Sequence, residues 1–317
     1  MSKHSMAVAG IDTGKHQLDV ALHGHKECLQ VGNDKTGHKQ LSCWLRQHGV
    51  QRVGIEASGG YERDVIAWLR KDGFTVIRFQ PRQVRAYAEF RLQRAKNDKI
   101  DAALIAACAA DAPIVHQAPD PRLEAFAEHL TLIEQIEEDM VRFKTRLEAV
   151  RDKQRRRLIE REIARLKAWR VLEMKRLADS LRQHQDLARR LVLAMSVQGV
   201  GERTAIACII RQPELGRINR EQAAALAGLA PYDDDSSDRH GARKIAGGRA
   251  RLRKSLYAAA LPAAFHWNPQ LVALYKRLIA AGKPHKVALV ACARKLIIFI
   301  NTVLARGTEW IPKPAHA

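Results

Sequence analysis

Four carboxylates in the first third of the chain are placed where they could hold a metal ion. Asp12 and Glu56 each end a short apolar run, and Asp98 and Asp101 lie three residues apart further along. Acids at the ends of neighbouring buried strands repel one another unless a cation or a proton lies between them. The set therefore predicts a site for two Mg²⁺ ions, with Mn²⁺ as the alternative, that acts on phosphodiesters.

Each of these acids also has a purely structural interpretation. Asp12 could be a turn residue after a strand, and Asp98 and Asp101 could simply open a helix, where the dipole favours acids. In such a helix, however, residues three apart lie on one face. Glu56 lies at the carboxyl end of a strand, the edge at which α/β sheets bind ligands. The four acids in this order are more specific than any pair.

The elements expected around these acids form a mixed α/β sheet. Three strand-like runs come first, close enough for hairpins, and later strands alternate with helices, which requires crossover connections. This order suits an RNase H-like fold. The expected strands are 7–12, 18–22, 28–31, 52–56 and 75–79, and the expected helices are 39–47, 62–71 and 98–110.

The chain as a whole is strongly basic. Its 317 residues include 54 Lys and Arg against 34 Asp and Glu, a net charge of +20. This surplus favours a polyanionic partner such as nucleic acid, and a plain basic surface is the alternative. No apolar run reaches the roughly 18–20 residues of a spanning helix, and the N-terminus lacks the apolar core of a signal peptide. We therefore expect a cytoplasmic protein without a membrane partner.

A long helical segment is expected after the prolines at 113, 119 and 121. Neither Gly nor Pro occurs from Arg122 to Gln198, and apolar residues recur in steps of three and four between 126 and 150. This near-heptad pattern predicts a helical hairpin or coiled coil whose apolar stripe forms a core or an oligomer seam. The basic run 151–157 is typical of a solvated face or turn, with phosphate contact as the alternative.

The last third of the chain is expected to be mostly helical. Gly199-Val200-Gly201 precedes a helix at 202–211, the pattern of a helix-hairpin-helix turn whose backbone N–H groups face a phosphate; a plain αα-corner fits equally well. Other helices are expected near 221–227, 250–265, 269–281 and 285–304. The polar loop 232–248 carries Ser236, which could approach a phosphodiester held by cations, or be part of a merely solvated loop.

Several sequence blocks, weak one by one, occur in a characteristic order. They are Gly10-Ile11-Asp12 with Leu18-Asp19-Val20, Glu56-Ala57-Ser58-Gly59-Gly60-Tyr61, Asn97-Asp98-Lys99-Ile100-Asp101-Ala102, Gly199-Val200-Gly201, Gly228-Leu229-Ala230-Pro231-Tyr232, Asp235-Ser236, and Gly247-Gly248-Arg249-Ala250-Arg251-Leu252-Arg253 with Leu256-Tyr257-Ala258-Ala259. In this order and spacing the chain resembles, over nearly its whole length, the Piv-related DEDD transposases of bacterial insertion sequences, described as bridge-RNA-guided serine recombinases.

The resemblance implies an organisation and a set of roles. Residues 1–118 would be a RuvC-like domain whose Asp12, Glu56, Asp98 and Asp101 bind the metal. Residues 119–190 would be a coiled-coil segment for oligomerisation, and 191–317 a mostly α-helical transposase domain. Its Ser236 would attack a DNA phosphodiester and form a transient phosphoserine bond.

The resemblance also implies partners. They are donor and target DNA, a structured noncoding guide (bridge) RNA, and further copies of the chain, from dimer to tetramer. The protein would act in the bacterial cytoplasm, at the nucleoid when active. Candidate phosphate or guide-RNA contacts are Arg239, Arg243, Arg249, Arg251 and Arg253, and a solvated helix face is the alternative for the last three.

Two positions depart from the family pattern. The family has Asp-Ser-Gly at the nucleophile, whereas this chain has Asp235-Ser236-Ser237, so Ser237 offers a second hydroxyl. The spacing from the flanking motifs favours Ser236. A threonine commonly precedes the third acid of the family, and Asn97 stands there in this chain.

Two other functions fit the same residues. A junction-resolving nuclease would use the four acids with metal-activated water and leave the serine loop structural. A basic nucleic-acid-binding protein without catalysis would leave the acids structural as well.

Overall fold

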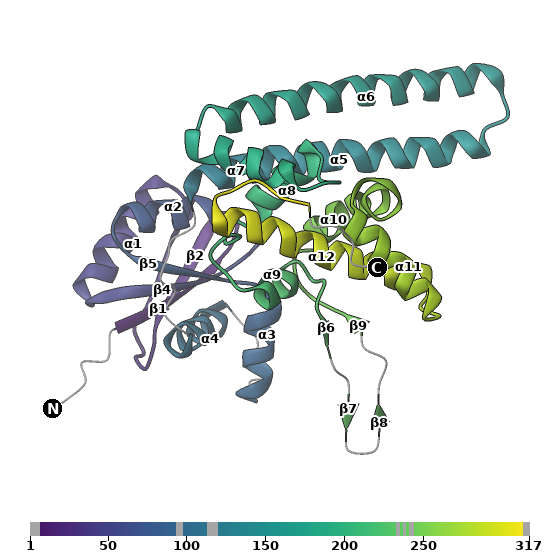
Figure 1. Cartoon of the computed structure of the whole chain (residues 1–317). Coiled ribbons are helices and arrows are strands. Elements are labelled where there is room, and N and C mark those ends of the chain that lie inside the picture. The colour runs from purple at the N-terminus through teal and green to yellow at the C-terminus, as the bar shows by residue number, and fades with distance from the viewer. Residues whose placement is uncertain are drawn as a thin grey trace. The chain divides into compact units, whose positions relative to one another are not determined.

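The chain folds into two compact units, Met1–Ala118 and Pro119–Ala317 (Figure 1). The computed structural model describes residues 7–92, 98–112, 120–232, 235–236, 239–240 and 244–312, with the backbone alone for 98–100, 235–236 and 239–240. The expected boundary after residue 118 coincides with the division into units. The further division expected after residue 190 stays a prediction, and helices on both of its sides share one hydrophobic core.

A five-stranded mixed sheet forms the centre of the first unit. Its strands β1 (Ala7–Thr13), β2 (Gln17–Leu22), β3 (Cys28–Gly32), β4 (Val50–Glu56) and β5 (Thr75–Phe79) lie in the order β3-β2-β1-β4-β5. β2 is antiparallel to both β1 and β3, whereas β4 is parallel to both β1 and β5. The mixed sheet and RNase H-like strand order expected from the sequence are confirmed.

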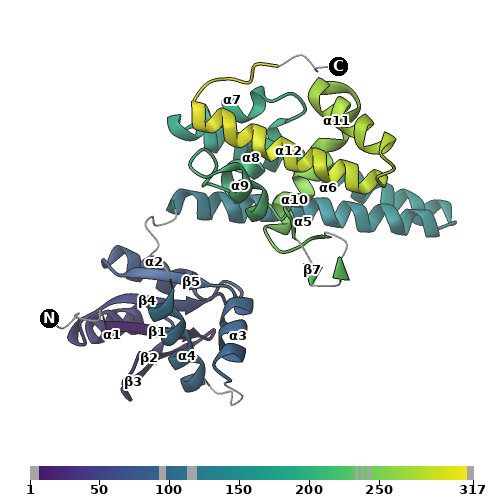
Figure 2. The ribbon, with the colours of Figure 1, turned by 60° about the horizontal axis from the view of Figure 1, so that its bottom comes forward.

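Helices cover both faces of this sheet (Figure 2). On one face, α1 (Lys35–Gln47) and α2 (Arg63–Lys71) pack against Ile11 and Ile55. On the other, α3 (Pro81–Phe90) and α4 (Asp98–Asp111) pack against Val8 and Ile77. Helix α3 was not among the expected elements, although Pro81 at its first position is a local start signal.

At Gly10 and Gly54 the backbone of helix α4 comes directly against the sheet. A Cβ atom on Gly10 would be 2.2 Å from both Ala102 O and Ala106 N, and one on Gly54 would be 3.0 Å from Ile105 O. The two strand glycines therefore leave room for the backbone of α4, and the small buried alanines of α4 allow the same close approach from the helix side.

The direction of α4 follows from Arg52. This buried side chain, two residues before Gly54 on β4, donates from Nη1 to the carbonyl oxygens of Ala109 and Ala112, each at 3.2 Å. The C-terminal end of α4 therefore lies toward the start of β4. Its first turn, with Asp98 and Asp101, lies toward the carboxyl ends of β1 and β4.

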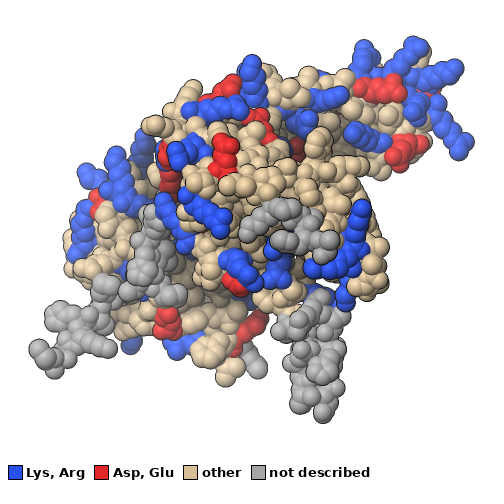
Figure 3. Space-filling model, in the orientation of Figure 1, with Lys and Arg blue, Asp and Glu red and all other residues tan. Residues whose placement is uncertain are grey.

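The second unit begins with an antiparallel helical hairpin of α5 (Pro121–Ala149) and α6 (Lys153–Arg182). Arg156 Nη1 donates to the carbonyl oxygens of Leu147 (2.8 Å) and Val150 (2.9 Å) and so closes the turn. Most of the basic run 151–157 therefore belongs to the first turns of α6 rather than to a connecting turn. Lys and Arg gather at this end of the hairpin (Figure 3).

The remaining helices of the second unit pack on the other end of the hairpin. The core they share includes Leu130 of α5 and Leu177 of α6. The mostly helical C-terminal region expected from the sequence is confirmed. Its helices are α7 (Gln185–Ser196), α8 (Glu202–Arg211), α9 (Arg220–Leu226), α10 (Ala250–Pro262), the π-helix η1 (Ala263–Trp267), α11 (Pro269–Ala280) and α12 (His285–Arg306).

Helix α12 is long and apolar enough to cross a membrane, by length and composition alone. The expectation that no segment passes this test is therefore wrong for α12. More than half of its apolar window is buried inside the structure, and its Leu289, Leu296 and Ile300 belong to the core of the second unit. Burial in this core accounts for its apolar composition.

The substitution Gly10→Ala is expected to destabilise the first unit by about 1–3 kcal/mol or more, because the new methyl group would overlap the backbone of α4. The measurement is urea denaturation of the full chain followed by circular dichroism. Gly201→Ala is the control, since open space surrounds its Cβ position and its φ is −80°. Equal stability of the two variants would contradict the close packing of α4.

Candidate functional site

Asp12 and Glu56 lie at the same edge of the sheet. Their strands β1 and β4 are adjacent and parallel, and the register pairs Gly10 with Gly54 and Ile11 with Ile55. Asp12 and Glu56 each come one residue after the paired Ile11 and Ile55, at the carboxyl end of their strands. Neighbouring strands are roughly 4.8 Å apart, so the two half-buried acids are close neighbours.

The two acids also lie on the same face. Side chains alternate along a strand, and Ile11 and Ile55 are buried in the core under α1 and α2. Asp12 and Glu56 therefore lie on the opposite face, which α4 covers. Because α4 begins at this edge, its half-buried Asp101 is brought to the same corner of the sheet.

Asp98 is one helical turn before this corner. Its backbone forms the first residue of α4, and its side chain lies outside the described residues. The structure thus places Asp12, Glu56 and Asp101 at one edge of the sheet and begins the helix at Asp98.

The donor chemistry of this edge suits a hard divalent cation. All four predicted ligands are carboxylates, the ligands that Mg²⁺ and Mn²⁺ prefer, and no Cys or His belongs to the set. Within the described part of the chain, no group of three or more His, Cys, Asp or Glu is positioned to hold a metal. Asp12, Glu56 and Asp101 therefore do not by themselves form such a group, and the side chain of Asp98 lies outside the described residues, so metal binding stays a prediction.

Asp19 is a fifth carboxylate at this edge, and the sequence alone suggested no role for it. It pairs directly with Asp12 across β1 and β2, so both lie on the α4 face. Its side chain is 7% exposed and accepts hydrogen bonds from Gln17 Nε2 (3.0 Å) and Gln30 Nε2 (2.8 Å). The alternation of Leu18 and Val20 with Asp19 was the available signal, but only the strand register shows what lies opposite.

The loop after Glu56 is organised by the buried carboxylate of Glu62. It accepts the backbone N–H groups of Ser58 (3.1 Å) and Gly60 (2.8 Å), and Arg78 lies 3.8 Å away. Burial alone would raise the pKa of Glu62, but these N–H groups, its own N–H and Arg78 outweigh it and lower the pKa. The ionised carboxylate thus fixes the chain that follows Glu56.

Ser236 belongs to a narrow β-ribbon between α9 and α10. The ribbon pairs β6 (Pro231–Tyr232) with β9 (Lys244–Ile245), and β7 (Asp235–Ser236) with β8 (Arg239–His240). It projects from the helices of the second unit (Figure 1). Ser236 pairs with Arg239 across the strands. The predicted Arg243 and the alternative nucleophile Ser237 lie outside the described residues.

The base of this ribbon is held shut by three glycines and an arginine. A Cβ on Gly248 would be 2.2 Å from Gly228 N, and one on Gly228 would be 2.5 Å from Gly247 O. All three have positive φ, which glycine alone adopts readily. Arg253 Nη1 donates to the carbonyl oxygens of Gly228 (3.2 Å) and Gly247 (2.7 Å). The backbone segments before and after the ribbon of Ser236 are therefore held in contact at its base.

Two of the other predicted phosphate contacts have acidic partners. Arg249 binds Glu214 through both terminal nitrogens, at 2.8 and 2.6 Å. Arg251 Nη1 donates to Glu134 Oε2 at 2.7 Å, and this buried carboxylate also accepts from Arg211. Together with Arg253, these residues join α10 to its neighbours. Contact with nucleic acid stays a prediction for all five arginines.

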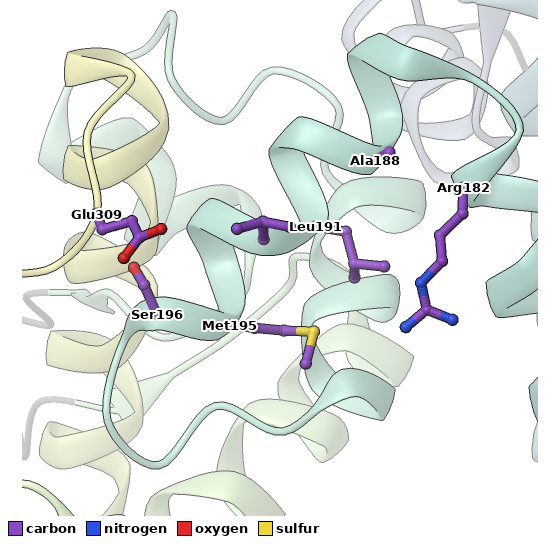
Figure 4. Close-up of a pocket in the computed structure, with 7 residues that line it drawn as sticks. Arg182, Ala188, Leu191, Met195, Ser196 and Glu309 are labelled. Atoms are coloured by element: carbon purple, nitrogen blue, oxygen red, sulfur yellow. The ribbon is translucent and has the colours of Figure 1, made fainter.

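A hollow of about 530 Å³ beside α7 does not belong to this site (Figure 4). Its lining includes Leu191, Met195 and Ser196. The Ser196 hydroxyl donates to Leu193 O (2.7 Å) and accepts the N–H of Trp310 (2.8 Å). That hydroxyl thus serves the fold, and no general base pairs with it among the described residues.

Comparison with known proteins gives two family matches. Residues 9–153 match the DEDD model of IS110 type, described as Transposase, and residues 192–276 match the model described as Transposase IS116/IS110/IS902 family. The first range holds the four predicted acids and the second holds Ser236. The chain is also 24% identical to the pilin gene-inverting proteins of Moraxella bovis and Moraxella lacunata, over 96% of this chain and 97% of each relative.

If this edge binds a divalent cation, Asp19→Asn should weaken binding about 10- to 100-fold, the usual effect of changing a group that supports a ligand. Titration of the full chain with Mn²⁺ measures the affinity. Asp64→Asn is the control and should bind normally, because Asp64 is an exposed acid on α2, which covers the opposite face of the sheet. Loss of binding in Asp12→Asn but not in Asp19→Asn would exclude Asp19 from the site.

Glu62→Gln should remove a pH-dependent part of the stability, about 1–3 kcal/mol for a buried charged acceptor. Because the folded pKa of Glu62 is lowered, its contribution is present above the ordinary value of about 4.3 and is lost as pH falls through the folded value. The melting temperatures of wild type and Glu62→Gln should thus differ near pH 7 and become equal in strong acid. The exposed Glu89→Gln is the control, and a constant difference at all pH values would contradict the ionised role.

Proposed function

Because the chain belongs to the IS110 family of DEDD transposases, a family of enzymes that act on DNA, we propose that it joins DNA strands through a serine. Asp12, Glu56, Asp98 and Asp101 hold the metal, and Ser236 is the nucleophile. The observation that carries the proposal is the gathering of Asp12, Glu56 and Asp101 at one sheet edge.

The acids act in this proposal by binding cations. The family implies a divalent metal; we propose two Mg²⁺ ions, for which Mn²⁺ can substitute. Bound there, the ions would supply positive charge to a phosphate and to its leaving oxygen. The protein's own part is to fix the carboxylates: the register of β1 and β4 sets two of them, and the seating of α4 on Gly10 and Gly54 sets the others.

The serine step conserves the phosphodiester bond energy. The Ser236 Oγ forms a bond to phosphorus, and the bond from phosphorus to one sugar oxygen breaks. The serine proton goes, overall, to that departing oxygen, which becomes a free hydroxyl. In the reverse sense, a hydroxyl of another strand attacks the phosphoserine and releases Ser236, so no water is consumed. The cation at Arg239, the cross-strand neighbour of Ser236, favours a phosphate at this end of the ribbon.

We propose that a structured noncoding guide RNA selects donor and target DNA by base pairing, while the protein contacts backbone and phosphate. Support comes from the net charge of +20 and from the resemblance described above. The reaction takes place in the bacterial cytoplasm, at the nucleoid.

We propose that the chain acts as a homo-oligomer, from dimer to tetramer. The helical hairpin is the proposed coiled-coil seam. It exposes apolar side chains that a partner helix could cover: Leu132, Val141, Leu158, Trp169, Val171 and Leu172.

The decisive experiment traps the protein on DNA. End-labelled DNA carrying the ends of the encoding element, with the noncoding RNA transcribed beside it and Mg²⁺, is incubated with the protein and resolved under denaturing conditions. Wild type should give a covalent adduct, and Ser236→Ala should give less than about 1% of it, as expected for a lost nucleophile. Ser237→Ala is the matched control and should keep the adduct, whereas Asp101→Asn should lose it.

Each other outcome points to a different function. An adduct in Ser236→Ala that disappears in Ser237→Ala moves the nucleophile by one residue. DNA cleavage without any adduct identifies a junction-resolving nuclease that uses water. Binding that falls with salt, without cleavage at any Mg²⁺ concentration, identifies a nucleic-acid-binding protein without catalysis.

A further inference from the structure

Three rings of the second unit form one ordered cluster, carried by η1, α11 and the start of α12. Phe265 of η1 and His285 of α12 have nearly parallel rings, with an interplanar angle of 9° and centroids 6.2 Å apart. Tyr275 of α11 stands almost perpendicular to both, at 76° and 85°. Its hydroxyl lies 2.6 Å from His285 Nδ1 and forms a hydrogen bond with it. We name these three residues the aromatic platform.

The platform is held in place before any ligand arrives. Pro262 lacks the N–H of a regular helix and is followed by the π-helix that carries Phe265. Asn268, 1% exposed, closes this π-helix: its N–H donates to Ala263 O (3.0 Å), and its Nδ2 donates to Gln198 O (3.1 Å). The rings therefore lose little freedom on binding, and such preorganisation favours affinity.

The platform remains open to solvent although its residues are apolar or aromatic. Phe265 is 41% exposed, His285 is exposed, and Tyr275 is half-buried. Nearby Val287 is 51% exposed. A fixed, exposed aromatic surface of this kind has no role in the core and calls for a partner.

The stretch of chain that carries the platform has charge of one sign. Between Asp238 and Glu309 the sequence holds fourteen Lys and Arg and no Asp or Glu. Four exposed cations flank the rings, namely Lys276 and Arg277 after Tyr275, and Lys283 and Lys286 on either side of His285. Among the described residues none of the four forms an ion pair. A second copy of this surface would be repelled, so the charge favours a polyanion.

Aromatic rings beside unpaired cations match the two parts of an unpaired nucleotide. Exposed rings stack on a base, and lysines bind the phosphates that follow it. Double-stranded DNA keeps its bases stacked inside, whereas folded RNA offers unpaired bases in its loops, which proteins bind on Phe, Tyr and His rings.

We propose that the aromatic platform binds unpaired bases of single-stranded RNA, with Lys283 and Lys286 on the adjoining phosphates. This inference rests on the RNA part of the proposed function and gives it a location: η1, α11 and the start of α12. The nearly parallel faces of Phe265 and His285 allow a base stacked on one to lie parallel to the other.

The test uses the full chain and a single-stranded RNA oligomer that contains one 2-aminopurine, whose fluorescence falls when the base stacks. Wild type should quench the fluorescence. Phe265→Leu keeps a large apolar side chain but removes the ring, and should weaken binding about 5- to 150-fold, the range for one lost stacking contact. Val287→Ala is the matched control, since it removes exposed carbon from the same surface but no ring.

A second arm tests the phosphate contacts. Lys283→Gln with Lys286→Gln should lower the slope of log affinity against log salt by roughly 1.4, since each phosphate contact on a single strand contributes about 0.7. The same charge change at Lys35 and Lys39, two exposed positions of α1 in the other unit, should leave the slope unchanged. Melting temperatures confirm that all variants fold.

Three outcomes would overturn the proposal. They are equal RNA affinity of Phe265→Leu and wild type, quenching that single-stranded DNA of the same sequence matches, and a preference for duplex RNA. The DNA adduct assay separates this proposal from the proposed reaction. If wild type forms no DNA adduct but Phe265→Leu still has a lower RNA affinity than wild type, the proposed reaction is contradicted and RNA binding by the aromatic platform is supported. If the adduct forms and RNA binding ignores Phe265, the reverse holds.

Discussion

The direct contact between the backbone of α4 and two strands of the sheet is the constraint on which the arrangement of the acids depends. Gly10 and Gly54 lie side by side in the register, and no larger residue leaves room for the helix at either position. With α4 seated there and anchored at its far end by Arg52, its first turn can only lie at the carboxyl edge of β1 and β4. Sequence-distant acids thus become neighbours through residues that carry no charge.

The serine is positioned on a different principle. The acids lie on packed elements of the first unit, whereas Ser236 is on a ribbon whose only anchorage among the described residues is at its base. Gly228 and Gly248 allow the two backbone segments to lie in contact there, and Arg253 donates hydrogen bonds to main-chain carbonyls of both. The base of the ribbon is thus fixed by contacts between backbone segments, whereas the acids are fixed by the packing of β1, β4 and α4.

The sequence predicted where most strands and helices lie, but not which distant residues contact one another. Apolar runs and glycine turns located all five strands of the first unit, and the long stretch without Gly or Pro located the helical hairpin. Asp19 and Arg251 show where such reasoning ends. The neighbour of Asp19 depends on strand register, and Arg251 meets Glu134, which is 117 residues away in the chain. Local patterns carry no information about such pairs, because tertiary packing alone selects them.

The distribution of charge connects these features. The acids of the candidate metal site lie among β1, β4 and α4, while the stretch from Arg239 to Thr308 has no acid of its own and relies on Glu214 and Glu134 to pair with Arg249 and Arg251. Arginines neutralised in this way hold the helices together, so the remaining cations are the ones available to a polyanion. The proposed RNA contact would therefore use Lys276, Arg277, Lys283 and Lys286, beside rings that stack, rather than Arg249 and Arg251, which already have acidic partners.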